Sequence, residues 1–132
     1  PPRSTLFPYT TLFRSANAGH NMPILYRAPE ENCIELDAEG LILGIKQSVV
    51  FEEGSTLLHP GDLILFYTDG INEATAPEGD MFGTSRICLH LATHSDETAE
   101  NISDSLYHEA RNFSGSRGLA DDISMVVLKI VA

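Results

Sequence analysis

The apolar run LILFYT, residues 63–68, limits most strongly what this chain can fold into. A strand with one face in solvent alternates apolar and polar side chains. A continuous apolar run of this length is instead typical of a strand that is covered on both faces. The chain is therefore expected to place a layer of structure on each side of this strand.

The remaining segments predict an α+β fold with a mainly antiparallel sheet, because strands come first, two helices follow, and a strand closes the chain. The predicted strands cover residues 24–26, 33–37, 48–53 and 123–131, and the predicted helices cover 86–94 and 95–113. In the longer helix, 95–113, Ser95 is the expected N-cap. The closing strand is expected to be buried. The segment HPGD, residues 59–62, is expected to form a turn, with Asp62 as a turn residue.

Charge and cysteine content narrow the class of protein. With 8 basic and 19 acidic residues the net charge is −11, which disfavours nucleic acid and anionic membranes as partners. No apolar run has the length that a transmembrane helix needs. Cys33 and Cys88 lie far apart without a paired motif, so reduced thiols in a cytoplasmic protein are expected, and a disulfide stays open.

Acidic residues stand at the ends of two predicted strands. Asp69 follows LILFYT directly, with Gly70 next, and Asp121 and Asp122 precede the closing strand. Each group alone is typical of a turn. If the two strands are antiparallel neighbours, Asp69 and Asp121 converge, and their repulsion favours a cation between them. Carboxylate oxygens suit magnesium or manganese better than zinc.

The chain contains five motifs in this order: ANAGHNMPILY, GLILGI, PGDLILFYTDGINEA, MFG and DDISMVVLKI. Their order and approximate spacing resemble those of the metal-dependent protein phosphatases. Over residues 16–131 the chain resembles the SpoIIE-like branch, bacterial relatives of the type 2C serine/threonine phosphatases. The resemblance implies an α-β-β-α sandwich, in which antiparallel sheets are flanked by helices. It also implies two Mn²⁺ or Mg²⁺ ions and hydrolysis of phosphoserine or phosphothreonine by a metal-bridging water.

The resemblance assigns roles to individual residues. Asp69 and Asp121 are expected to be metal ligands, and Asp122, Gly70 and His20 are expected to support that site without binding metal. His20, in the AGHN motif, is expected to orient or stabilise its turn. No side chain is assigned as a catalytic acid, base or nucleophile, and no organic cofactor is expected.

The resemblance also implies partners and two rival functions. The expected substrate is a phosphoprotein, such as an anti-sigma-factor antagonist in bacterial signalling. The alternative is a non-catalytic phosphatase-like interaction domain, and a carboxylate-rich cation-binding domain is a third reading. Two upstream aspartate motifs of the family do not occur here. We therefore expect a C-terminal portion of the domain, with the N-terminal half missing and no activity alone; an upstream bridging aspartate would favour the enzyme.

The opening segment PPRSTLFPYTTLFRS, residues 1–15, reads unlike the rest of the chain. Pro8 and Tyr9 interrupt any apolar centre, so it does not resemble a signal peptide. Its residues match, one for one, a translation of a widely used short-read sequencing adapter. We therefore expect residues 1–15 to be non-native and residues 16–132 to be the phosphatase portion.

Overall fold

The computed structural model describes residues 11–131, so predictions about residues 1–10 lie outside the described residues. The strands are β1 (Thr11–Ala16), β2 (Ile24–Arg27), β3 (Asn32–Glu35), β4 (Glu53–Leu58), β5 (Leu63–Tyr67) and β6 (Met125–Lys129). The helices are α1 (Asp69–Asn72), α2 (Gly83–Thr93) and α3 (Ala99–Ser114), followed by the 3-10 turn η2 (Gly115–Arg117). None of the helices within residues 11–131 is long and apolar enough to cross a membrane.

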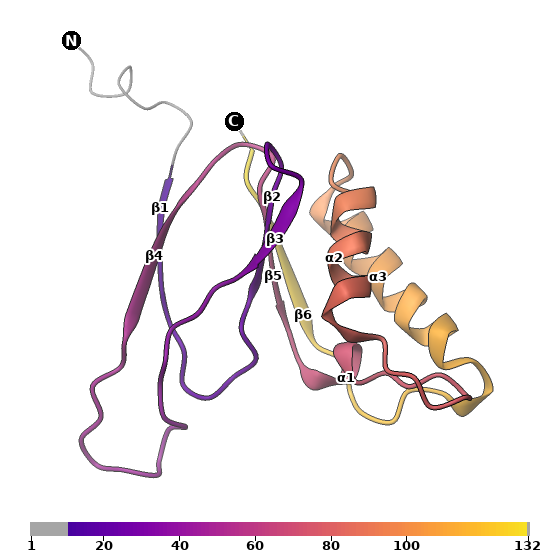
Figure 1. The fold of residues 1–132 in the computed structure, drawn as a ribbon, viewed down its shortest axis with the longest axis horizontal. Coiled ribbons are helices and arrows are strands. Elements are labelled where there is room, and N and C mark those ends of the chain that lie inside the picture. The colour runs from indigo at the N-terminus through magenta and orange to yellow at the C-terminus, as the bar shows by residue number, and fades with distance from the viewer. Residues whose placement is uncertain (1–10, 132) are drawn as a thin grey trace.

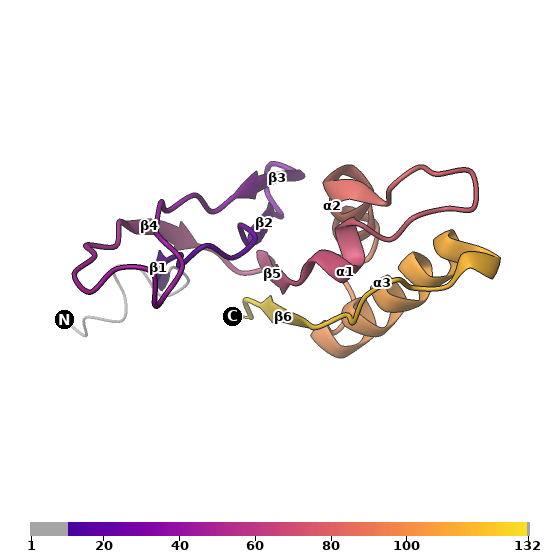
Figure 2. The ribbon, with the colours of Figure 1, turned by 90° about the horizontal axis from the view of Figure 1, so that it is seen from below.

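The strands form two antiparallel sheets, which confirms the α+β prediction. A four-stranded sheet has the order β3-β2-β5-β6, and β1 pairs with β4 in a second sheet. The β1–β4 sheet lies on one side of the four-stranded sheet, and α2 and α3 lie on the other (Figure 1). The same succession of layers is seen from below (Figure 2). The arrangement is part of an α-β-β-α sandwich.

Strand β5 is covered on both faces, as its continuous apolar sequence predicts. Leu63 and Leu65 are buried in a cluster that includes Ile87 and Leu91 of α2 and Ile102 of α3. On the opposite face, Ile64 is buried with Leu25 and Leu58, and Phe13 and Phe66 pack against them. Burial stabilises the fold by about 1.5–3 kcal/mol for each such side chain.

The strand predicted at residues 48–53 is not formed. Residues 36–52 make a long connection, and β4 begins only at Glu53. The backbone N–H of Glu52 donates to Glu39 O at 3.2 Å, which joins the base of this connection. Val50 is 97% exposed. The apolar residues of segment 48–53 favour a strand. A strand also needs a neighbouring strand to complete its backbone hydrogen bonds.

Two predictions about the C-terminal half were also wrong. The closing strand was predicted to be buried, but β6 is only half-buried. It lies at the sheet edge, and α3 covers only one of its faces, so Val126 is 61% exposed.

The N-cap of α3 was predicted to be Ser95, but it is Thr98, whose hydroxyl accepts from Asn101 N at 3.2 Å. Ser95 instead donates to Ala92 O, in a turn whose carbonyls also accept from Lys129. That turn delays the start of the helix.

Residues 11–15 of the opening segment, together with Ala16, form β1. The strand pairs along its length with β4, from Thr11 opposite Leu58 to Ala16 opposite Glu53. An exposed ion pair joins Arg14 to Glu53, with 2.6 Å between Nη2 and Oε1. The non-native origin of residues 1–15 stays a prediction.

Candidate metal centre

The end of β5 and the start of β6 are joined by hydrogen bonds that pass through Thr68. The two strands are antiparallel neighbours, with Tyr67 opposite Met125. Beyond that pair, Thr68 N donates to Ser124 O at 3.0 Å, and Ser124 N donates to Thr68 Oγ1 at 3.0 Å. The segments that carry Asp69 and Asp121 therefore leave the sheet at the same end, where β5 finishes and β6 begins. The sequence predicted this for neighbouring antiparallel strands.

Asp69 begins the short helix α1 and has an exposed side chain. The backbone N–H of Glu73 donates to Asp69 O at 2.9 Å, which fixes the turn without using the carboxylate. The next residue, Gly70, is buried against the backbone of Asp122, where a side chain would not fit. Glycine thus allows the segment after β5 to approach the segment before β6.

Asp121 and Asp122 lie in the connection between η2 and β6, and both side chains are exposed. Asp122 N donates to Asp121 Oδ1 at 2.8 Å, which orients the Asp121 carboxylate. Both residues line an open hollow of about 800 Å³, together with Tyr107 and Ser124. Solvent and a phosphorylated side chain would both have access to carboxylates in this position.

His20 lies at the same end of the sheet. It precedes β2, which is antiparallel to β5, so the start of β2 lies beside the end of β5. His20 N donates to Asn17 Oδ1 at 2.7 Å, and Asn17 Nδ2 donates to His20 O at 2.9 Å. The His20 ring is 3.1 Å from Asn21 O through Nδ1. These contacts fit the expected turn-stabilising role, which stays a prediction.

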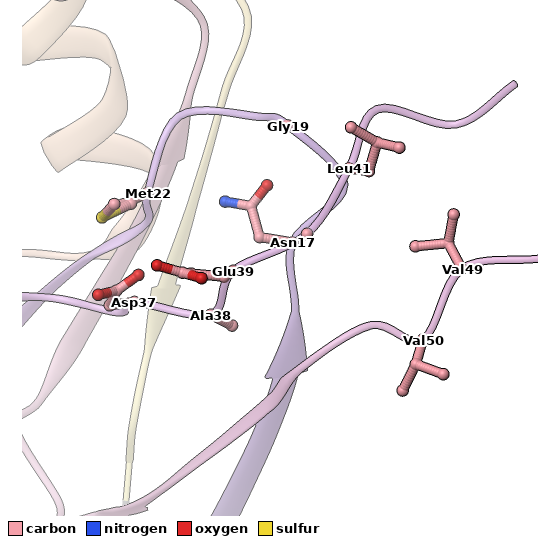
Figure 3. Close-up of a pocket in the computed structure, with 10 residues that line it drawn as sticks. Asn17, Gly19, Met22, Asp37, Ala38, Glu39, Leu41, Val49 and Val50 are labelled. Atoms are coloured by element: carbon pink, nitrogen blue, oxygen red, sulfur yellow. The ribbon is translucent and has the colours of Figure 1, made fainter. Parts of the chain in front are cut away.

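A second hollow, of about 610 Å³, opens beside the His20 loop. It is lined by Asn17 and Met22 and by the carboxylates of Asp37 and Glu39, with Val50 among the apolar lining residues. Figure 3 shows the two carboxylates on the wall near Met22, away from the valines. Sequence analysis did not single out Asp37 or Glu39, because neither belongs to a motif that marks a site.

The charges near the strand end affect Tyr67, the last residue of β5. Burial is the main reason that the pKa of Tyr67 is raised, and the negative charges of Glu35, Cys88 and Asp69 raise it further. Asp69 is therefore close enough to act on the Tyr67 hydroxyl, although burial is the larger effect.

The donors present fit a hard divalent cation in type but not in number. Asp69 and Asp121 offer carboxylate oxygens, the ligands that Mg²⁺ and Mn²⁺ prefer. Among residues 11–131, no group of three or more His, Cys, Asp or Glu side chains could hold a metal ion. Asn72 Oδ1, in α1, is buried and has no hydrogen-bond partner among residues 11–131. Since a buried amide oxygen normally has a partner, α1 carries an unused acceptor three residues after Asp69.

Asp62, expected to be a turn residue, has a larger role. The HPGD turn forms as predicted, with Asp62 N donating to His59 O at 3.0 Å. The Asp62 side chain is completely buried, and its Oδ2 lies 2.9 Å from Arg27 Nη1 in an ion pair. It also accepts from the backbone N–H of His59 and of Ala28. Only the folded chain brings Arg27 to this position.

The fold defines the class of protein. The structure of the PP2C phosphatase domain and a fragment of the regulatory domain of the cell fate determinant SpoIIE from Bacillus subtilis gives a TM-score of 0.73. The match has 23% identity and covers 92% of this chain and 34% of that one. This is the fold of PP2C phosphatase domains. The chain belongs to the SpoIIE family, since the family described as Stage II sporulation protein E (SpoIIE) matches residues 4–131.

Two further relatives are similar in sequence. The phosphoserine phosphatase RsbU of Bacillus subtilis (strain 168) is 30% identical over 120 residues, which are 89% of this chain and 34% of RsbU. The structure of the RsbU and RsbW domains of Rv1364c from Mycobacterium tuberculosis matches with a TM-score of 0.67 and 26% identity. That match covers 92% of this chain and 33% of the chain in that structure. The present chain thus spans about a third of the length of each chain that it matches.

Proposed function

We propose that this chain is part of a metal-dependent protein phosphatase that hydrolyses phosphoserine or phosphothreonine. One observation carries the proposal: the Thr68–Ser124 hydrogen bonds join the segments that carry Asp69 and Asp121, and Asp121 lines an open hollow. Membership of the SpoIIE family and similarity to a phosphoserine phosphatase support the same activity.

Asp69 and Asp121 would hold Mn²⁺ or Mg²⁺ through their exposed carboxylates. When bound, such ions lower the pKa of a bridging water and neutralise charge on the phosphoryl oxygens. The chain's own contribution is the position of the two ligands. Asp122 orients Asp121 through its backbone N–H, and Gly70 permits the close approach of the two segments.

The substrate that we propose is a small phosphoprotein in bacterial signalling, of the anti-sigma-factor antagonist type. RsbU is named as a phosphoserine phosphatase, and the Rv1364c structure contains RsbU and RsbW domains. A cytoplasmic location follows from such a substrate. The open shape of the hollow beside Asp121 suits a side chain that is presented on the surface of another protein.

The remaining metal ligands would come from upstream sequence of the kind that the family carries. We therefore expect the chain alone to lack activity, and the chain joined to its natural upstream sequence to hydrolyse a phosphoserine peptide when Mn²⁺ is added. A chelator should abolish the reaction. If the joined protein binds a phosphoprotein but never hydrolyses it, the rival function, a non-catalytic interaction domain, is correct.

A further inference from the structure

The chain's two cysteines, far apart in sequence, lie together in the fold. Cys33 is on β3 and Cys88 is on α2, two elements that contact each other. Both side chains are half-buried and pack against the same apolar cluster, which includes Tyr26 and Ile87. Strand pairing sets the position of Cys33, which is opposite Tyr26 of β2. The contact between α2 and β3 therefore brings the two cysteines into the same region, where the helix layer covers the edge strand of the four-stranded sheet.

The environment makes the two thiols unequal. The neighbouring Cys88 thiol is the main reason that the pKa of Cys33 is raised, and burial raises it further. The Cys33 thiol in turn lowers the pKa of Cys88, although burial and the Glu35 carboxylate oppose that change. Cys88 is thus the thiol that more readily becomes a thiolate, the form that reacts with oxidants.

We propose that Cys33 and Cys88 form a dithiol site that an oxidant of the peroxide class converts into a disulfide between β3 and α2. The proposal is independent of phosphatase activity. Both thiols are partly exposed, so a molecule as small as hydrogen peroxide can reach them. In a reducing compartment such a disulfide would be transient, which is the usual behaviour of a redox-sensing pair.

The reaction has two balanced steps. The Cys88 thiolate attacks one peroxide oxygen, the O–O bond breaks, and the leaving hydroxide takes a proton to become water, which leaves a sulfenic acid on Cys88. Cys33 sulfur then attacks Cys88 sulfur. The S–S bond forms, the S–O bond breaks, and the departing hydroxide takes the Cys33 proton as water. Two thiols are oxidised and one peroxide is reduced to two waters.

The test treats the reduced full chain with hydrogen peroxide and measures free thiols and peptide masses without reduction. We expect both thiols to disappear together, one cross-linked peptide pair that contains Cys33 and Cys88, and full reversal by dithiothreitol. Cross-linking should be on the order of tenfold faster in buffer than in concentrated urea, because folding holds the two sulfurs together. The oxidised chain should melt roughly 5–15 °C higher.

Two matched variants separate the roles of the cysteines. Cys33→Ser should leave a sulfenic acid on Cys88 that dimedone traps, and Cys88→Ser should abolish the cross-link. The inequality of the two thiols depends on both being present, so the attacking thiol is identified in the parent chain: with limiting peroxide and excess dimedone, Cys88 should be labelled about tenfold more than Cys33. Equal labelling of the two cysteines would overturn the assignment of Cys88 as the attacking thiol. The proposal as a whole is overturned if cross-linking is as fast in urea as in buffer, or if only disulfides between chains form.

Discussion

A Cβ atom on Gly70 would lie 2.3 Å from the carbonyl oxygen of Asp122 and 3.0 Å from Ile123 Cγ1. The first distance is too short for a side chain unless the backbone moves, and at the second the Ile123 side chain would have to shift. Gly70 follows one proposed metal ligand, and Asp122 follows the other. The close approach of these two residues therefore sets how near Asp69 and Asp121 can come to each other.

Gly70→Ala should push the segment before β6 away from α1. We expect a loss of about 1–3 kcal/mol in the free energy of unfolding, because the added methyl group meets backbone that must shift. Gly54→Ala is the matched control, since its added Cβ would meet nothing closer than Asp37 O at 3.1 Å. Urea unfolding of both variants checks this, and equal losses would show that the Gly70 contact is not a constraint.

The Asp62–Arg27 ion pair should be important for stability. Asp62→Ala leaves the guanidinium of Arg27, whose side chain is only 15% exposed, without its carboxylate partner. Removing one member of a buried pair costs about 3–5 kcal/mol. Glu53→Ala breaks the exposed pair with Arg14 and should cost less than about 1 kcal/mol. Denaturant unfolding of both variants measures the two losses in the free energy of unfolding. Similar losses for Asp62→Ala and Glu53→Ala would refute this interpretation.

Residues 1–15 lead to a prediction about the gene. We propose that this segment is translated adapter, although residues 11–16 pair with β4 as strand β1. Long-read DNA from an independent clone should differ from the present sequence before Ala16 and continue upstream in frame. Recovery of the codons for residues 1–15 in genomic DNA would contradict this origin.

The sequence predicted best those features that depend on local pattern. The continuous burial of β5 follows from its apolar run, and the turn before it follows from Pro60 and Gly61, whose φ is +93°. The predicted convergence of Asp69 with Asp121 rested on the assumption that β5 and β6 are neighbours. The pairing of the two strands confirms that assumption. The metal-binding role of the two residues stays a prediction.

The features that the sequence did not predict depend on contacts between distant segments. The apolar residues Val49 and Val50 were predicted to form a strand, but the fold gives them no neighbouring strand. The partner of Cys88 is on β3, and no motif links the two cysteines. The burial of Asp62 likewise depends on Arg27, which lies at the end of another strand.

We propose that Asp69 and Asp121 bind the catalytic metal ions. Asp69→Asn and Asp121→Asn keep the shape of the side chain but remove its charge. In the chain joined to its upstream sequence, each should lower turnover by a factor on the order of 10²–10⁴. His20→Ala should have a much smaller effect, because the contacts of His20 are with its own loop.

The most direct test is the single-turnover rate of phosphoserine-peptide hydrolysis at saturating Mn²⁺, measured for these three variants with a melting curve for each. We expect both asparagine variants to melt like the parent protein, or slightly higher without metal because carboxylate repulsion is relieved, and to lose nearly all activity. If both asparagine variants keep nearly full rate while His20→Ala loses it, the assignment of the metal ligands is wrong.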